Sequence, residues 1–348
     1  MLTPPATIRQ LERIDVSTDQ AVGQNDVDAL DTIALPDPGT VRRGQLRFSH
    51  PTLDGWSWPY TVVRGAADGP RLALISGVHP TEYPAIEANI RLMRSLDPAA
   101  ISGTVVSLPL VNVPSFLSRT PFVSPIDQKN PNRAFPGDPD GTFTEVLTDA
   151  VFRAVIAPSD ALVDLHGGDM VEDLVPFSIY SVSGDAAVDR ASADLGRAFG
   201  LPYLVASRPQ PGLGGTTTQA AAAAGVPGVL AEAGGRGLLT EPETQLLVDG
   251  TMRVLRHLGM LPGGTAEAAP AVTEVTAFTW LRSPAEGLWY PSVAAGDEVA
   301  DGQTIGTIRD LFGEPVADIP APHRGVVLFV TSSPAMPNDG LVMAIGAP

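Results

Sequence analysis

Short apolar runs alternate with amphipathic stretches between residues 46 and 262, and several of these runs end at polar or glycine-rich segments. The apolar runs are strand-like and too short to be core helices, whereas the stretches between them carry apolar residues at helical spacing. The clearest strand candidates are residues 71–79, 103–113, 161–166 and 225–235, and the clearest helix candidates are residues 84–96, 142–156, 186–200 and 243–260. Parallel strands need crossover connections, usually helices, so this alternation predicts a mixed α/β fold with a mainly parallel sheet and helices on both faces.

Two segments flank the predicted α/β domain of residues 46–262, which is long enough to be a catalytic domain. Residues 1–45 form a polar N-terminal extension without clear periodicity. Gly, Pro, Ala and Thr then dominate residues 262–271, which is typical of a domain boundary. Beyond it, short β-rich pieces such as GLWYPSV, GQTIGTI, GVVLFV and GLVMAI are separated by Gly and Pro, which predicts a small all-β domain at residues 270–348.

Composition excludes several classes of function. The chain has no cysteine, so a thiolate nucleophile, a thiolate metal site and a disulfide framework are all excluded. Its formal net charge of -17 argues against a nucleic-acid partner, because phosphate binding needs a basic surface. No apolar stretch is long enough to span a membrane, and the first residues lack the features of a secretory signal, so we expect a cytoplasmic protein.

Polar residues of metal-binding type stand where predicted strands end. His79 and Glu82 lie three residues apart at the end of one strand, His166 ends a second strand further along the chain, and Glu232 stands at the end of a third apolar run. In open α/β sheets ligands bind beyond the carboxyl ends of the strands. Two histidines and a glutamate, with a fourth position for water, form a known catalytic zinc set, and a further carboxylate suits proton transfer.

A less specific explanation exists for each of these residues. A single histidine at a strand end is more often a hydrogen-bonded polar residue than a metal ligand. The joint pattern is more specific, because the chain has only five histidines and two of them follow predicted strands.

The segment KNPNRAFPGD, residues 129–138, is too rich in proline and glycine for regular structure. Its Asn132 and Arg133 are candidates for a carboxylate clamp, since a guanidinium group offers two parallel hydrogen bonds to a carboxylate. The alternative is an ordinary turn with a solvent-facing arginine. Lys129 is the single lysine of the chain, so any chemistry that needs a lysine has one candidate.

Four motifs, GVHPTE, NPNRAFPG, DLHGG and AEAGG, resemble in order and spacing the succinylglutamate desuccinylase and aspartoacylase family, a branch of the zinc carboxypeptidase fold. The resemblance covers about residues 46–348. It implies one Zn²⁺ per chain, held by His79, Glu82 and His166. It also implies that Glu232 is the general base that activates a water molecule and then protonates the leaving amine.

The same resemblance implies roles for three further residues. Asn132 and Arg133 would bind the substrate carboxylate, and Arg119, in PSFLSRTPF, is similar to an arginine that stabilises the oxyanion. The sequence also departs from the family pattern, because Asn130 stands where the family often has an aspartate that orients a metal-binding histidine. Either metal affinity is then modest or Asp164 of DLH does the orienting.

The C-terminal segments AAGDEVADGQTIGTI and APHRGVVLFV resemble a biotinyl or lipoyl hammerhead, which implies a barrel-like β domain. A working carrier of that type needs a lysine, and residues 270–348 contain none. We therefore expect a structural domain or a lid that narrows the active site and favours small substrates over peptides.

The function predicted is a zinc-dependent deacylase that hydrolyses the amide bond of a small N-acylated amino acid, with a small molecule as its partner. An N-acetylated diaminobutyrate is one candidate substrate, since related deacylases of this type exist. Two alternatives stay open: a metallocarboxypeptidase acting on peptides, and a non-catalytic binding protein that kept the fold. A homo-oligomer is also compatible with the sequence.

Overall fold

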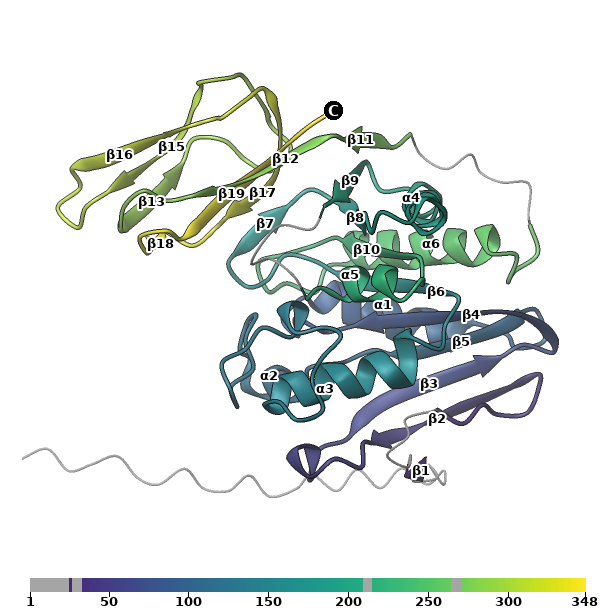
Figure 1. The fold of residues 1–348 in the computed structure, drawn as a ribbon. Coiled ribbons are helices and arrows are strands. Elements are labelled where there is room, and N and C mark those ends of the chain that lie inside the picture. The colour runs from purple at the N-terminus through teal and green to yellow at the C-terminus, as the bar shows by residue number, and fades with distance from the viewer. Residues whose placement is uncertain (1–24, 27–32, 209–214, 264–270) are drawn as a thin grey trace, which may run out of the picture.

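A computed structural model of the chain describes residues 25–26, 33–208, 215–263 and 271–348, and its centre is a ten-stranded sheet (Figure 1). The strand order is β1-β2-β3-β5-β4-β6-β10-β8-β9-β11. In chain order, the strands of this sheet are β1 (Asn25–Asp26), β2 (Thr40–Arg47), β3 (Trp58–Arg64), β4 (Ala67–Ser76), β5 (Ser102–Leu108), β6 (Ala161–His166), β8 (Phe177–Ser181), β9 (Tyr203–Ser207), β10 (Gly228–Glu232) and β11 (Thr273–Val275).

The predicted mixed, mainly parallel sheet is confirmed. Strands β5, β4, β6 and β10 run parallel at the centre, and β8, β9 and β11 are parallel to one another. Antiparallel pairs occur where β3 joins β2 and β5, and where β10 joins β8. The carboxyl ends of β4, β6 and β10 therefore meet at one edge of the sheet.

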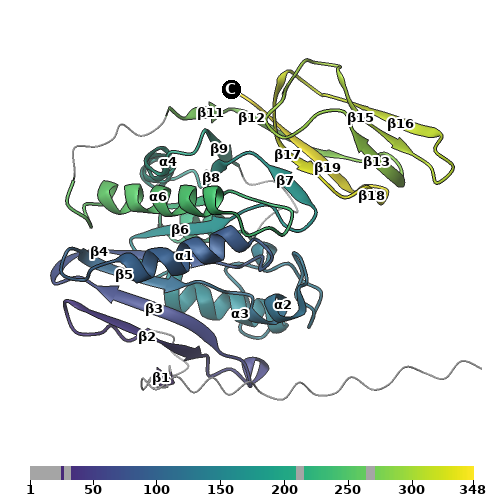
Figure 2. The ribbon, with the colours of Figure 1, turned by 180° about the vertical axis from the view of Figure 1, so that it is seen from behind.

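Helices cover both faces of the sheet, as predicted. The α-helices are α1 (Tyr83–Ser95), α2 (Val113–Ser118), α3 (Phe143–Val151), α4 (Ala186–Phe199), α5 (Thr217–Ala223) and α6 (Glu241–His257). Two short 3-10 helices, η1 (Pro51–Leu53) and η2 (Pro131–Arg133), and a π-helical segment, η3 (Phe152–Ile156), complete the set. Figure 1 shows α3 and α5 in front of the sheet, and Figure 2 shows α1 and α6 on the opposite side.

Residue alternation in the buried strands explains this two-sided burial. In β4, Leu72 and Leu74 pack with side chains of α1, α4 and α6, whereas Ala73 and Ile75 pack with side chains of α3, η3 and α5. Successive side chains of a strand point to opposite faces, so a strand covered on both sides is apolar throughout. These two clusters form the core on which the strand ends are fixed.

Local signals set the helix ends. Asp185 caps α4 by accepting from the backbone N–H groups of Ala187 and Val188, and Gly200 ends the helix in a left-handed conformation with φ of 77°. Thr142 and Glu145 form a capping box at the start of α3. Residues at the ends of these two helices therefore determine where α3 begins and where α4 begins and ends.

Residues beyond 275 form two antiparallel sheets, of order β12-β19-β17-β14 and β16-β15-β13-β18. Their strands are β12 (Ala277–Arg282), β13 (Gly287–Pro291), β14 (Glu298–Val299), β15 (Thr304–Arg309), β16 (Pro315–Pro320), β17 (Gly325–Thr331), β18 (Ala335–Met336) and β19 (Leu341–Ala347). One hydrophobic cluster contains Trp289, Ile308 and Val327 from both sheets. The predicted all-β content of this region is thus present.

Strands cross the predicted domain boundary in both directions. β11 lies beyond residue 270 yet pairs with β9 of the large sheet, and β7 (Glu172–Leu174) pairs with β17 of the C-terminal sheet. At the other end, β2 begins at Thr40, inside the predicted N-terminal extension, most of which lies outside the described residues. The structure also contains no described helix with the length and hydropathy that a membrane crossing requires.

Candidate active site

Four predicted site residues follow three adjacent strands at the carboxyl edge of the sheet. His79 stands just after β4, and Glu82 lies at the N-terminal boundary of α1. His166 is the last residue of β6, and Glu232 is the last residue of β10. Since β10 and β6 pair in parallel register with Glu232 opposite His166, the sheet itself brings these side chains together.

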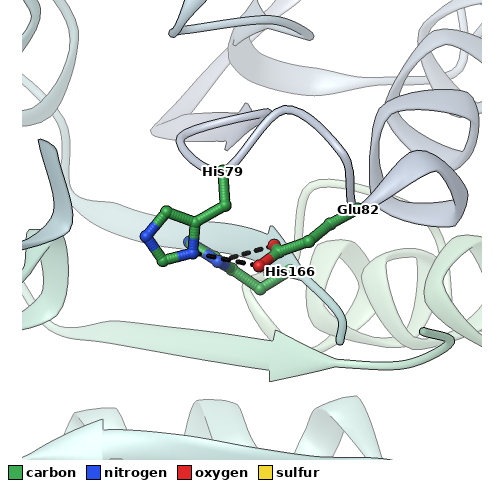
Figure 3. Close-up of side chains that lie close together, drawn as sticks. All are labelled: His79, Glu82 and His166. Carbon is green, nitrogen blue, oxygen red and sulfur yellow. Dashed lines mark hydrogen bonds and ion pairs between the residues drawn. The ribbon is translucent and has the colours of Figure 1, made fainter. Parts of the chain in front are cut away.

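His79, Glu82 and His166 form one buried group (Figure 3). The Nδ1 atom of His79 is 3.0 Å from Glu82 Oε1, and the Nδ1 atom of His166 is 2.9 Å from Glu82 Oε2. One ligand atom from each residue lies within 4.8 Å of the others. The two imidazole rings are nearly perpendicular, with centroids 5.1 Å apart. The three residues predicted as metal ligands are therefore gathered in one place.

The second ring nitrogen of each histidine has its own acceptor. His79 Nε2 lies 3.0 Å from Asn130 Oδ1, and His166 Nε2 lies 3.1 Å from Asp164 Oδ2. Asn130 Oδ1 also accepts from the backbone N–H of Asn132, which fixes the orientation of the amide. The sequence left open whether Asn130 or Asp164 orients a metal-binding histidine. In the structure Asn130 faces His79 and Asp164 faces His166.

This arrangement fits a bound cation. Because Asn130 and Asp164 accept at Nε2, each neutral histidine carries its proton there and turns an Nδ1 lone pair toward Glu82. Two lone-pair atoms about 3 Å apart repel each other unless a proton or a metal ion lies between them. Hydrogen bonding of the second nitrogen is the usual arrangement of a metal-binding histidine.

The pKa values of His166 and Glu82 point to the same conclusion. Burial alone lowers the pKa of His166, but Asp164 and Glu82 outweigh it and raise that pKa well above its usual value. Burial raises the pKa of Glu82, yet the two histidines outweigh it and the net pKa is lowered. The pocket therefore favours positive charge between these side chains.

Glu232 lies beside this group, opposite His166, and its carboxyl forms no ion pair with any of the described residues. Burial raises its pKa well above the usual value, with His166 acting in the opposite direction. Its Oε2 atom is buried and has no hydrogen-bond partner among the described residues. An unpaired buried carboxyl is costly and is typical of groups that exchange protons with a ligand.

Asn132 and Arg133 lie on η2, next to Asn130. Asn132 is buried, and its Oδ1 accepts from the backbone N–H of Thr217 at 3.1 Å. Arg133 is exposed as a whole residue, but burial of its guanidinium group lowers the pKa, and the charge of Glu232 acts in the opposite direction. Arg133 is thus within electrostatic range of Glu232, whereas Asn132 already supports α5.

Arg119 is less well placed than the other predicted residues. It ends α2 with a left-handed φ of 54° and is exposed. Within the described part of the chain, no hydrogen bond or ion pair joins its side chain to the other candidates, so its oxyanion role stays a prediction.

Lys129, the single lysine of the chain, forms an ion pair with Glu145 at 2.6 Å, which ties the segment before η2 to α3.

Three residues near the site were missed in the sequence. Thr217 donates its hydroxyl hydrogen to Asp164 Oδ2, the same atom that faces His166. Asp169 and Glu172 follow the DLHGG motif, and burial raises their pKa values to about 6 and about 7, with Glu82 adding to both shifts. The acidic residues directly after DLHGG were a signal for the last two, whereas nothing in the sequence singled out Thr217.

Comparison with known proteins identifies the family. Residues 68–258 match the model of the succinylglutamate desuccinylase/aspartoacylase catalytic domain. The chain is also 32% identical over 295 residues to the N-alpha-acetyl-L-2,4-diaminobutyric acid deacetylase of Halomonas elongata, which covers 82% of this chain and 84% of that protein. The chain belongs to the succinylglutamate desuccinylase/aspartoacylase family.

Solved structures of this family are similar over most of the chain. The product-bound ectoine utilization protein EutE (DoeB) from Ruegeria pomeroyi has a TM-score of 0.81 and 27% identity, and the match covers 91% of this chain and 98% of that one. A succinylglutamate desuccinylase/aspartoacylase from Rhodobacter sphaeroides has a TM-score of 0.75 and 28% identity, covering 88% and 95%. The family resemblance deduced from the four motifs is therefore confirmed.

Proposed function

We propose that this protein is a zinc-dependent deacylase that hydrolyses the amide bond of a small N-acylated amino acid. The observation that carries the proposal is the buried group of His79, Glu82 and His166 with Glu232 at the adjoining strand end. His79, Glu82 and His166 would hold the ion, and catalytic zinc sites with three protein ligands keep their fourth position for water or substrate. When bound there, zinc activates a water molecule and polarises the acyl carbonyl group.

The residues of the chain then have separate tasks. Glu232 accepts a proton from the attacking water and donates it to the nitrogen of the leaving amine as the amide C–N bond breaks. Its raised pKa suits a group that must both take up and release a proton near neutral pH. Asn130 and Asp164 hold the histidine rings, and Arg133, with Asn132 beside it, binds the substrate carboxylate.

The substrate class we favour is an N-acetylated diamino acid such as N-α-acetyl-2,4-diaminobutyrate. Its support is the relative from Halomonas elongata, whose name states this deacetylase activity, together with the similarity to an ectoine utilization protein. Such a compound has one carboxylate for Arg133 and one free ammonium group.

The C-terminal region narrows access to the site in this proposal. Its β17 pairs with β7, which follows the loop of the DLHGG motif. The barrel-like, hammerhead-like form predicted for residues 270–348 stays part of the proposal, and the hydrophobic cluster shared by its two sheets supports it. A restricted entrance favours small acyl amino acids over peptides.

The test is a substrate panel combined with metal analysis. Purified protein is loaded with zinc and offered N-α-acetyl-L-2,4-diaminobutyrate, N-acetylaspartate, N-succinylglutamate and a set of short peptides. We expect about one zinc per chain and the highest kcat/KM with the acetylated diamino acid. Faster cleavage of peptides would support a metallocarboxypeptidase instead, and absence of zinc after incubation with the metal would leave only a binding protein.

A further inference from the structure

Asp169 joins three chain segments at the edge of the metal-binding group. Its side chain is fully buried, and both carboxylate oxygens accept from backbone N–H groups. Oδ1 accepts from Met170 at 2.8 Å, and Oδ2 accepts from Phe122 at 3.2 Å, across 47 residues of sequence. The backbone oxygen of Asp169 accepts from Arg236 at 3.0 Å, in the loop after β10.

The segments that donate to Asp169 have unusual backbone conformations. Phe122 and Arg236 have φ values of 56° and 59°, and Arg119, in the same loop as Phe122, has a φ of 54°. Residues with a Cβ atom rarely adopt positive φ, and such conformations persist only where surrounding contacts impose them. The hydrogen bonds from Phe122 and Arg236 to Asp169 are contacts of that kind.

Phe122 in turn contacts the metal-binding group. Its ring packs edge-on against the ring of His79, with centroids 5.8 Å apart and an interplanar angle of 79°. The loop held by Asp169 therefore lies directly against a predicted metal ligand. The position of Phe122 depends on a positive φ angle, which a phenylalanine residue rarely adopts.

The C-terminal sheet supports Asp169 from the other side. The backbone N–H of Asp169 donates to Glu172 Oε2 at 2.9 Å, and Glu172 faces Thr331 in the β7–β17 pair. The backbone N–H of Ser332 donates to the oxygen of Val171 at 2.8 Å. A continuous set of hydrogen bonds thus connects the C-terminal sheet, through Glu172 and Asp169, to the loop at His79.

We propose that Asp169 is a positioning residue that holds residues 119–123 in their strained conformation against His79. The carboxylate acts through the Phe122 amide and keeps both Phe122 and the backbone that carries Arg119 at the metal-binding group. It does not itself bind the metal or the substrate in this assignment. The kinetic part of its test rests on the proposed deacylase function, and the structural part does not.

The test compares Asp169→Asn with Asp173→Asn. Asparagine has the same shape but one acceptor oxygen in place of two, so it cannot accept from both Met170 and Phe122. Asp173 is a matched control on the same segment, because its side chain is 40% exposed and its ion pair to Arg236 is 3.9 Å long. Residue-resolved hydrogen exchange, zinc content and steady-state kinetics are measured for both variants.

We expect hydrogen exchange in residues 119–123 to be about tenfold faster in Asp169→Asn, the effect of losing one hydrogen bond, with wild-type zinc content. With an N-acylated substrate that the wild type hydrolyses, kcat falls about tenfold or more and KM changes less, because misplacement of groups around the reacting atoms slows chemistry. Asp173→Asn behaves as the wild type in both measurements.

The exchange measurement decides the proposal even if no substrate is turned over. Unchanged exchange in residues 119–123 of Asp169→Asn, or faster exchange with unaltered kcat, overturns it. If Asp169→Asn does not fold, the wild type still provides a test. Its Phe122 amide must then be protected although it lies in a loop, and an unprotected Phe122 amide overturns the proposal.

Discussion

Glu232 lies directly opposite His166 in the parallel ladder between β10 and β6. The two side chains are therefore held by neighbouring backbone positions rather than by flexible loops. The carboxyl proposed to transfer protons and the histidine proposed to bind the metal therefore keep a fixed separation as long as the sheet is intact. Rigid elements of this kind are the most precise supports for reacting groups.

Substitution of Glu232 by glutamine tests the proton-transfer role. Glutamine is close in size but has no carboxylate to accept a proton, so kcat should fall by about 10²–10⁴-fold while KM changes little. Zinc content should equal that of the wild type, because Glu232 is not one of the three clustered ligand residues. Turnover at the wild-type rate in Glu232→Gln would remove Glu232 from the mechanism.

The hydrogen bonds behind the histidines predict changes in zinc affinity. Asp164→Asn removes the negative charge that faces His166 Nε2, so zinc affinity should fall by about 10–100-fold. Asn130→Asp adds a charge behind His79 and should raise affinity above the wild-type value. Competition with a chromogenic chelator measures both variants. Equal affinity in wild type and Asp164→Asn would mean that the hydrogen bond does not support ligation.

Arg133→Lys tests carboxylate recognition. Lysine keeps the charge but loses the planar pair of donors, so KM should rise by about tenfold with a smaller change in kcat. Arg197→Lys is the control, since Arg197 is half-exposed and pairs with Glu274 away from the site. An unchanged KM in Arg133→Lys would favour the alternative of a solvent-facing arginine.

The zinc-free protein should lose stability as pH rises from about 5 to 8. Burial raises the pKa of Glu172 to about 7 and that of Asp169 to about 6, so the folded state holds protons that the unfolded state has released. The free energy of unfolding falls with pH wherever the folded state binds more protons. His166 acts in the same direction, because its raised folded-state pKa gives stability that is lost as pH rises through it.

Thermal melts across this range check the prediction. We expect Tm to fall by about 5 °C or more between pH 5 and 8, since about 1 kcal/mol shifts Tm by a few degrees in a protein of this size. The pKa of Glu82 is lowered in the folded state, so its effect on stability has the opposite sign. That effect changes only at pH values below the ordinary glutamate pKa of 4.5, outside the range tested. Glu172→Gln should flatten the profile, and a Tm that is constant or rises with pH in the wild type would contradict the assignment.

The sequence alone was sufficient to predict the strands and helices that have a clear local pattern of apolar residues. Apolar strands alternating with amphipathic helices specified the mainly parallel sheet, because burial on both faces makes such strands continuously apolar. His79, Glu82 and His166 stand at or just after strand ends, and ligands bind beyond the carboxyl ends of parallel strands, so these residues could be predicted as a site.

The sequence by itself therefore determined the central strands β4, β5, β6 and β10, the helices α1, α3, α4 and α6, and the polar residues at the ends of β4, β6 and β10. Tertiary structure alone decided that β8 is antiparallel to β10, and that β7 and β11 cross the predicted domain boundary. It also decided that Asn130 and Asp164 each support one histidine, and that Asp169 holds Phe122. The physical reason is that residue periodicity reports which side chains are buried, whereas pairing and hydrogen bonding between distant segments depend on how the folded chain brings them together.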